Sequence, residues 1–104
     1  MIKKAKKRNI SFQKLSKVAE ILKAISHPVR LEILEILEVH ESLTVSEIRE
    51  ILAPEVEQSM LSHHLIKMKD KGILHSTKNG KYISYQITEP HILNIFDCME
   101  NCNF

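Results

Sequence analysis

Hydrophobic residues recur every three or four positions in five stretches of this sequence, and they alternate with polar residues in a sixth. The first spacing is typical of a helix that buries one face, and alternation is typical of a half-buried strand. We therefore predict helices within residues 12–25, 28–38, 44–52, 58–71 and 90–99, and two strands within residues 73–87. This order predicts a mainly α fold (α+β) in a single domain that covers residues 10–104.

The helix predicted at residues 44–52 has both a start signal and a stop signal. Thr44 can accept a hydrogen bond from the Glu47 amide while the Glu47 carboxylate accepts one from the Thr44 amide, which forms a capping box. Pro54 ends the helix because it lacks an amide hydrogen and disfavours the helical region for the residue before it. The connection at residues 53–57 is short enough to hold the next helix at a sharp angle. The expected buried stripe consists of Ile48, Ile51 and Leu52.

The helix predicted at residues 58–71 has an apolar face and a polar face, and Gly72 follows where a left-handed cap is needed. The apolar face consists of Leu61, His64, Leu65 and Met68. The polar face consists of Gln58, Ser59, Ser62 and His63. Side chains of these types hydrogen-bond to base edges and phosphates in the major groove of DNA. The alternative is that this polar face is only the solvated side of an amphipathic helix.

A reversal of charge along the chain favours contact with nucleic acid. Residues 32–57 carry eight glutamates and one arginine, a net charge of −7, whereas residues 58–81 carry five lysines and one aspartate, a net charge of +4. A basic patch limited to one helix and the hairpin after it is the electrostatic pattern of phosphate contact. We assign this contact to Lys67, Lys78 and Lys81.

Asn79-Gly80 separates the two predicted strands, which run from Ile73 to Lys78 and from Lys81 to Ile87. Asn-Gly favours a type I′ turn, in which both central residues have positive φ. The second strand is expected to alternate through Ile83, Tyr85 and Ile87. A hairpin with lysines at its tip, beside a polar helix, would contact the DNA backbone next to the groove, although an ordinary solvated tip is the alternative. The order helix, turn, helix and hairpin predicts a winged helix-turn-helix with a two-stranded wing.

Three segments of the chain match a recurrent sequence pattern. They are LKAISHPVRLEIL at residues 22–34, LTVSEI at residues 43–48 and SMLSHHLIKMKDKGIL at residues 59–74. They resemble the ArsR/SmtB family of bacterial winged-helix transcriptional repressors over roughly residues 12 to 96, and the HPVR and SHHL motifs make the resemblance specific. It implies a homodimeric repressor that binds an inverted-repeat operator and is released by an inducer. By position, the family's base and phosphate contacts fall on Gln58, Ser59, Ser62 and His63.

The helices at the two ends carry apolar stripes that the DNA-binding unit alone does not need. One stripe consists of Phe12, Leu15, Val18, Ala19, Leu22 and Ile25; the other follows Pro90 and consists of Ile92, Leu93, Ile95, Phe96 and Met99. They could pack on the domain's own core, or they could form a two-fold interface that sets two recognition helices roughly 34 to 36 Å apart. We assign a dimer interface to Phe12, Leu15, Ala19, Leu22, Ile92, Ile95, Phe96 and Met99.

The helix that starts at Pro28 is expected to be a central core element. Its apolar side consists of Val29, Ile33, Ile36 and Leu37, and its solvated side of Glu32, Glu35 and Glu38. Evenly spaced acids on an amphipathic helix are poor candidates for catalytic carboxylates. The sequence has no nucleophile with a base and an orienting group and only two glycines, so an enzyme is the least supported class. A winged-helix module that binds proteins and not DNA is the main alternative.

Residues 1–9 are expected to form a basic disordered tail. The first eight residues contribute +5 to a chain whose net charge is +2. This charge could add phosphate contacts or only solubility. Because the tail lacks the apolar region of a secretory signal and no apolar run approaches the roughly 20 residues of a membrane span, we expect a cytoplasmic protein.

The inducer is the least determined part of the resemblance. Residues 40–52 contain no cysteine, so one type of metal site found in the family is absent. For the other type, His91 is retained, but its expected partners fall on Thr88 and Asn101, which are poor ligands for transition metals. These departures argue against zinc-type sensing, and no cofactor is assigned.

Cys98 and Cys102 remain, four residues apart on one face of the last helix. Two thiolates at this spacing could bind a soft ion such as Zn(II) or Cu(I), or As(III) with a third ligand. They could also respond to oxidants, or they could be two reduced thiols without a sensing role.

Overall fold

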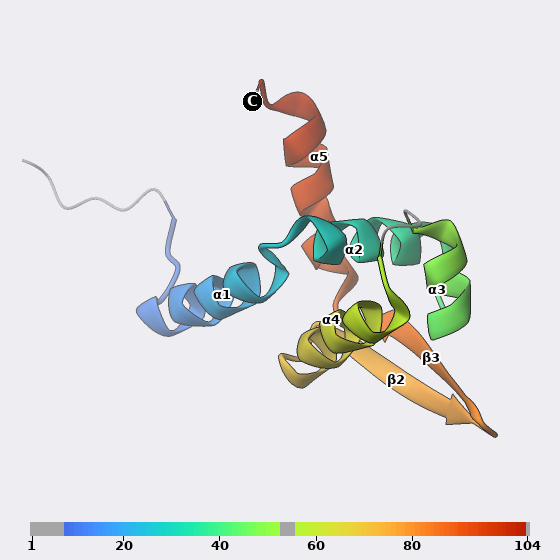
Figure 1. The fold of residues 1–104 in the computed structure, drawn as a ribbon. Coiled ribbons are helices and arrows are strands. Elements are labelled where there is room, and N and C mark those ends of the chain that lie inside the picture. Colours follow the sequence, from blue (N-terminus) through green and yellow to red (C-terminus); the bar gives the residue numbers. More distant parts are fainter. Residues whose placement is uncertain (1–7, 53–55, 104) are drawn as a thin grey trace, which may run out of the picture.

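The computed structural model describes residues 8–52 and 56–103, so most of the predicted basic tail and the expected helix stop at Pro54 lie outside the described residues. The elements follow in the order of a winged helix-turn-helix with one further helix at each end (Figure 1). They are α1 (Phe12–Ile25), α2 (Pro28–His40), β1 (Leu43–Thr44), α3 (Val45–Ile51), α4 (Gln58–Asp70), β2 (Leu74–Asn79), β3 (Tyr82–Ile87), the 3-10 turn η1 (Pro90–Leu93) and α5 (Asn94–Asn101). The predicted fold class is confirmed.

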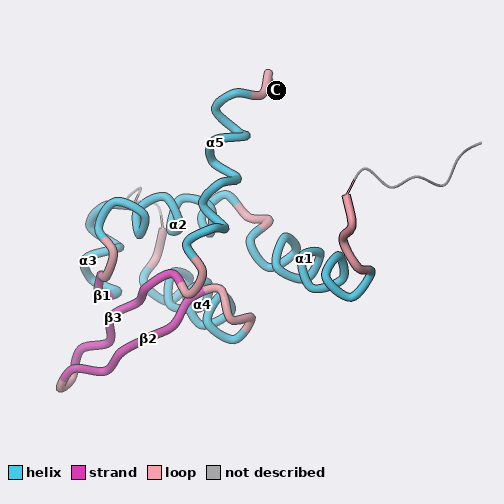
Figure 2. The backbone as a smooth tube through the Cα atoms, turned by 180° about the vertical axis from the view of Figure 1, so that it is seen from behind, coloured by secondary structure: helices cyan, strands magenta, loops and turns pink. Residues whose placement is uncertain are grey.

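The sheet has one strand more than the sequence predicted. Its antiparallel order is β1-β3-β2, and the two-residue strand β1 pairs with the middle of β3 (Figure 2), where Leu43 lies opposite Tyr85. Such a short strand leaves no alternation to detect. β1 ties the segment just before α3 to the hairpin, so the wing and the helix-turn-helix form one unit.

The turn of the hairpin differs from the prediction by one residue. Asn79 pairs with Tyr82, so the two loop residues are Gly80 and Lys81. Gly80 has a φ of +66°, and Glu41 is the only non-glycine residue with positive φ in the part of the chain that the structure describes. The predicted type I′ turn on Asn79-Gly80 is therefore wrong. A positive φ at the first loop residue alone is typical of a type II′ turn, which needs glycine only at that position.

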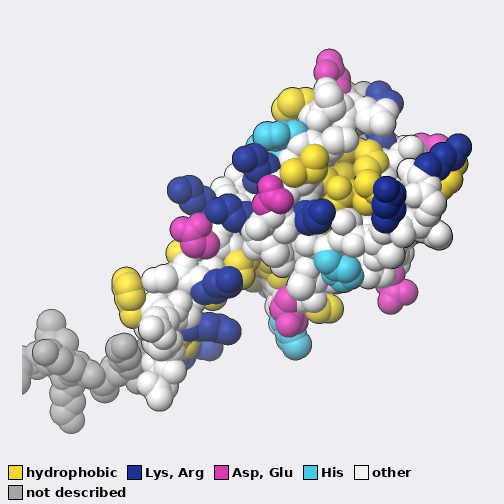
Figure 3. Space-filling model, turned by 90° about the horizontal axis from the view of Figure 1, so that it is seen from below, with side chains coloured by type: hydrophobic (Ala, Val, Ile, Leu, Met, Phe, Trp, Pro, Cys, Tyr) yellow, Lys and Arg dark blue, Asp and Glu magenta, His cyan; other side chains and the backbone are white. Residues whose placement is uncertain are grey.

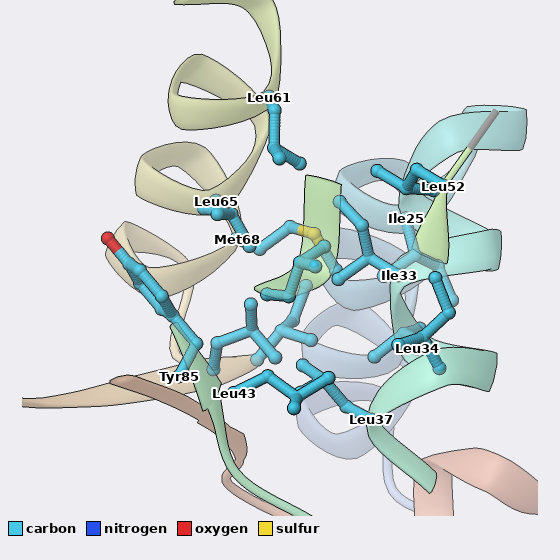
Figure 4. Packing of buried hydrophobic residues seen from close by; sticks show 14 of the residues in the cluster. Ile25, Ile33, Leu34, Leu37, Leu43, Leu52, Leu61, Leu65, Met68 and Tyr85 are labelled. Carbon is cyan, nitrogen blue, oxygen red and sulfur yellow. The ribbon is translucent and has the colours of Figure 1, made fainter. Parts of the chain in front are cut away.

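The core lies between α2, α3, α4 and the base of the sheet (Figure 4). Its fully buried side chains are Ile25, Ile33, Leu34, Ile48, Leu61, Leu65, Met68 and Leu74. Burial of each such side chain contributes about 1.5 to 3 kcal/mol. The predicted apolar face of α4 is confirmed by this burial. The predicted left-handed cap is also confirmed, because Gly72 has a φ of +78°. The Gly72 amide donates a hydrogen bond to the Lys69 carbonyl, and the Ile73 amide donates one to the Met68 carbonyl.

Two positions expected to be buried are exposed. Ile51 is 45% exposed because α3 ends there, and the extended backbone of Leu52, with a ψ of 163°, places the Leu52 side chain in the core instead. Ile83 is 42% exposed because it lies near the tip of the hairpin, beyond the helices that cover Tyr85. The predicted alternation of β3 therefore holds only near the base of the sheet.

The end helices extend away from this core (Figures 1 and 2). In α1, the buried residues are Ala24 and Ile25 at its C-terminal end, whereas Phe12 is 80% and Leu15 48% exposed. The last helix starts later than predicted, since Pro90 begins a 3-10 turn and α5, which has no buried residue, begins at Asn94. None of the helices within residues 8–52 and 56–103 is long and apolar enough to cross a membrane.

Candidate nucleic-acid interface

α3 and the core fix the orientation of α4. The capping box at the start of α3 is present, because Thr44 N–H donates to Glu47 Oε1 at 2.8 Å and Glu47 N–H donates to Thr44 Oγ1 at 3.2 Å. One side of α4 is then held in the core by Leu61, Leu65 and Met68, each without exposed surface. The opposite side must face solvent.

The predicted polar face of α4 lies on that outer side. Gln58, Ser59 and His63 are exposed and Ser62 is half-buried, so the structure brings all four to one end of the helix at or near the surface. These side chains offer hydroxyl, amide and imidazole groups, which donate and accept hydrogen bonds in the manner that base edges require.

The predicted lysines lie on two elements, α4 and the hairpin. Lys67 is exposed on α4, and Lys78 and Lys81 are exposed at the tip of the hairpin, where Lys81 Nζ lies 5.5 Å from the centre of the Tyr82 ring. Figure 3 views the molecule from the side on which α1, α4 and the hairpin lie in Figure 1, and Lys and Arg side chains are spread across this face. Asp and Glu side chains also lie on this face, among the Lys and Arg side chains.

A buried polar network lies beneath α4 and was not predicted. His64 is only 4% exposed, and its Nδ1 accepts a hydrogen bond of 3.0 Å from Arg30 Nε. Arg30 Nη1 also donates to the Ala24 carbonyl at 2.7 Å, so one guanidinium connects α1, α2 and α4. Because arginine stays protonated, His64 must accept at Nδ1, which requires a neutral ring with its proton on Nε2.

The surroundings of His64 favour this neutral form. Burial lowers the pKa of His64 first, and electrostatic interactions with His27, Arg30 and His63 lower it further. His27 lies close by because it caps α2: its Nδ1 accepts from Val29 N–H at 3.1 Å, and its ring centre is 4.5 Å from that of His64. The HPVR motif thus supplies a helix cap, a first-turn proline and the arginine of the network.

The candidate sensing residues do not come together as a site of three or more ligands. Cys98 Sγ and Cys102 Sγ are 3.4 Å apart on exposed side chains, and their hydrogen bond raises the pKa of Cys102. His91 pairs instead with Glu89, and this hydrogen bond lowers the pKa of Glu89. Across residues 8–52 and 56–103, no group of three or more His, Cys, Asp and Glu side chains is arranged to hold a metal ion.

Comparison with known proteins identifies the family. A family model described as a helix-turn-helix domain matches residues 25–77. The transcriptional repressor PagR of Bacillus anthracis is 38% identical over 86 residues, which cover 83% of this chain and 84% of PagR. The crystal structure of PagR superposes with a TM-score of 0.74 at 35% identity, covering 86% of this chain and 99% of the PagR chain.

Two further relatives agree with this assignment. The crystal structure of the transcriptional repressor BigR from Xylella fastidiosa superposes with a TM-score of 0.74 at 29% identity, covering 88% of this chain and 93% of the BigR chain. A homologue of the cadmium resistance regulatory protein CadC from Staphylococcus aureus is 29% identical over 91 residues, which cover 88% of this chain and 74% of that protein. This chain therefore belongs to the ArsR/SmtB family of winged helix-turn-helix repressors and is a DNA-binding transcriptional regulator.

Proposed function

We propose that this regulator acts as a homodimeric repressor that places the polar face of α4 in the major groove of an inverted-repeat operator and leaves the operator when an inducer binds. The observation that carries the proposal is the position of α4. Its apolar side is locked in the core, its polar side is turned outward, and exposed lysines lie on the same helix and on the hairpin.

The residues of this surface have different roles in the proposal. Gln58, Ser59, Ser62 and His63 contact base edges or nearby phosphates, and glutamine can bond adenine with both amide atoms. Lys67, Lys78 and Lys81 contact phosphates, which adds affinity without reading the sequence.

The second copy of the chain covers the apolar stripes of the end helices. This part of the proposal is supported by the exposure of Phe12 and Leu15 on α1 and of Met99 on α5. Large apolar side chains that stay exposed in one chain mark an interaction surface. The remaining members of the proposed interface are Ala19, Leu22, Ile92, Ile95 and Phe96. A two-fold arrangement would set the two α4 helices about one turn of DNA apart.

The proposed inducer contact is the thiol pair, Cys98 and Cys102. Two exposed sulfurs 3.4 Å apart suit a soft ion such as Cu(I), whereas Zn(II) and As(III) need ligands beyond the pair. The cadmium resistance named for one relative supports a thiophilic inducer. The test is Cys98→Ser combined with Cys102→Ser: operator release by Cu(I), Zn(II), As(III) or peroxide should be lost, and release unchanged by the substitutions would remove the thiol pair from the proposal.

The test of the DNA surface starts with selection of duplexes from a random pool by the full-length protein. Ser62→Ala with His63→Ala should weaken binding to the selected duplex at least about tenfold, because base contacts contribute about 1 to 3 kcal/mol. Lys78→Ala with Lys81→Ala should weaken binding to all duplexes alike and reduce the salt slope by about 2. Sedimentation should show that both variants keep the wild-type association state. Unchanged gel shifts for both would remove this surface assignment.

A further inference from the structure

A cleft between α1 and α4 is lined mainly by basic side chains. It has a volume of about 210 Å³, and its lining residues, which we call the α1–α4 cleft, are Glu20, Lys23, Ala24, Arg30, Lys67 and Lys71. Four cationic side chains against one carboxylate give the lining a net charge of +3. The volume is several times the roughly 30 Å³ that one water occupies. The cleft therefore has the charge and the room to hold an oxyanion.

Arg30 is already oriented in this cleft. Its guanidinium is partly buried and is fixed by the hydrogen bonds to the Ala24 carbonyl and His64 Nδ1. These bonds use two of its five N–H groups, which leaves the others for an anion. Because the side chain is ordered before an anion arrives, binding costs less conformational entropy than it would for a free arginine.

The lysines of the cleft are exposed, and the acid opposing them is loosely held. Lys71 Nζ lies 3.9 Å from Glu20 Oε2, and both side chains are more than half exposed. Exposed ion pairs of this kind contribute at most about 1 kcal/mol. An incoming oxyanion can therefore take the place of the Glu20 carboxylate beside Lys71.

The cleft is continuous with the proposed DNA surface. Lys67 lines the cleft and is also one of the proposed phosphate contacts of α4. The basic lining residues come from α1, α2 and the C-terminal end of α4, and Lys and Arg side chains are spread over the face shown in Figure 3. We infer that the α1–α4 cleft binds a backbone phosphate of the operator, with Arg30 inside the cleft and Lys23 and Lys71 beside it. This inference rests on the proposed function and extends the DNA contact to α1, outside the winged helix.

The test compares two double substitutions that remove the same charge. Lys23→Gln with Lys71→Gln should weaken binding of the full-length protein to its selected operator at least about tenfold at low salt and reduce the salt slope by about 1, since one phosphate contact contributes about 0.9. Lys14→Gln with Lys17→Gln removes two charges from α1 outside the cleft, and it should change the slope by less than half as much. Equal changes in the two variants would overturn the inference.

The substitution Glu20→Gln should change operator binding in the opposite direction to the lysine substitutions. It removes the one carboxylate among the lining residues of the cleft, so operator binding should become tighter by about two- to threefold at low salt. Unchanged or weaker binding would count against the cleft. The side chains substituted in these variants are all exposed, and thermal unfolding should confirm that each variant folds.

The source of the phosphate is tested with the side-chain Nε–H signal of Arg30 in NMR spectra. The signal should shift when one equivalent of operator duplex is added, and it should not shift with inorganic phosphate at the same ionic strength. A shift with inorganic phosphate alone would overturn DNA as the source. If the wild type binds no duplex, the proposed function fails; if it binds and the Lys23 and Lys71 variant keeps the wild-type salt slope, only the cleft is overturned.

Discussion

The helices of the winged-helix unit and the two end helices all have apolar residues at helical spacing in the sequence. They differ in whether other residues of the same chain bury those apolar residues. In α2 and α4, the apolar stripe is packed within the same chain, and Ile33 and Leu65 have no exposed surface. In α1, Phe12 and Leu15 keep 80% and 48% of their surface exposed. Periodicity therefore shows that a face is apolar, but it does not show whether the same chain or a second copy buries it.

The largest expected effect tests the self-contained core. Leu65→Ala should lower the free energy of unfolding by about 3 kcal/mol at every protein concentration, because it leaves a cavity among buried side chains. Ile66→Ala is the matched control, because Ile66, the next residue on α4, is 50% exposed and its substitution should cost less than about 1 kcal/mol. Urea denaturation measures both. Equal losses would mean that α4 is not packed as described.

The next effect concerns the end helices. Leu15→Glu should weaken dimer formation by about 2 kcal/mol, the size typical of an important interface residue, while the single chain stays folded. Ser16→Glu adds the same charge one position away, outside the proposed interface, and should leave dimerisation unchanged. Sedimentation equilibrium over a range of concentrations separates the two outcomes. Wild-type association by the Leu15 variant would place the interface elsewhere.

A smaller effect is expected at the start of α3. Thr44→Ala should cost about 1 kcal/mol of stability because the Glu47 amide loses its side-chain acceptor. Thr44→Ser keeps that acceptor and should recover most of the loss, whereas Ser46→Ala, within the helix, should be close to neutral. Thermal unfolding of the three variants checks this order. A loss in the serine variant as large as in the alanine variant would rule out the capping bond as the cause.

The smallest effect is the pH dependence that His64 contributes. Since the folded-state pKa of His64 is lowered, the unfolded chain takes up this proton first as the pH falls below about 6.5. The contribution to stability is thus complete above that pH and declines as the pH falls toward the lowered value. In the variant His64→Asn, the asparagine side chain can still accept a hydrogen bond from Arg30 but does not titrate. Between about pH 7 and pH 5.5 this variant should therefore lose less stability than the wild type does.

His75→Asn is the control for this experiment, because His75 is exposed on the hairpin. The His75 variant measures the effect of removing a histidine outside the buried network. If the His64 variant follows the pH profile of the wild type, the buried network has no part in the pH dependence.

The sequence predicted the parts of the fold that depend on neighbouring residues. The capping box at Thr44, the glycine cap at Gly72 and the two faces of α4 all follow from spacings within one helix. The exact turn of the hairpin did not follow, because Asn79-Gly80 permits a type I′ turn but the strands pair one residue further along.

The features that were missed depend on residues far apart in the chain. Arg30 and His64 are 34 positions apart, so the hydrogen bond between them has no signal in a single sequence. The α1–α4 cleft likewise needs the relative placement of three helices. The HPVR and SHHL motifs marked the residues of the network but gave no reason to pair them.

The most direct test of the central claim is the mass of the complex with a selected operator, measured by sedimentation at low salt. The account predicts two chains per duplex, with a complex that dissociates as salt rises because phosphate contacts release counterions. A chain that stays monomeric and forms no complex with any duplex at low ionic strength would contradict it.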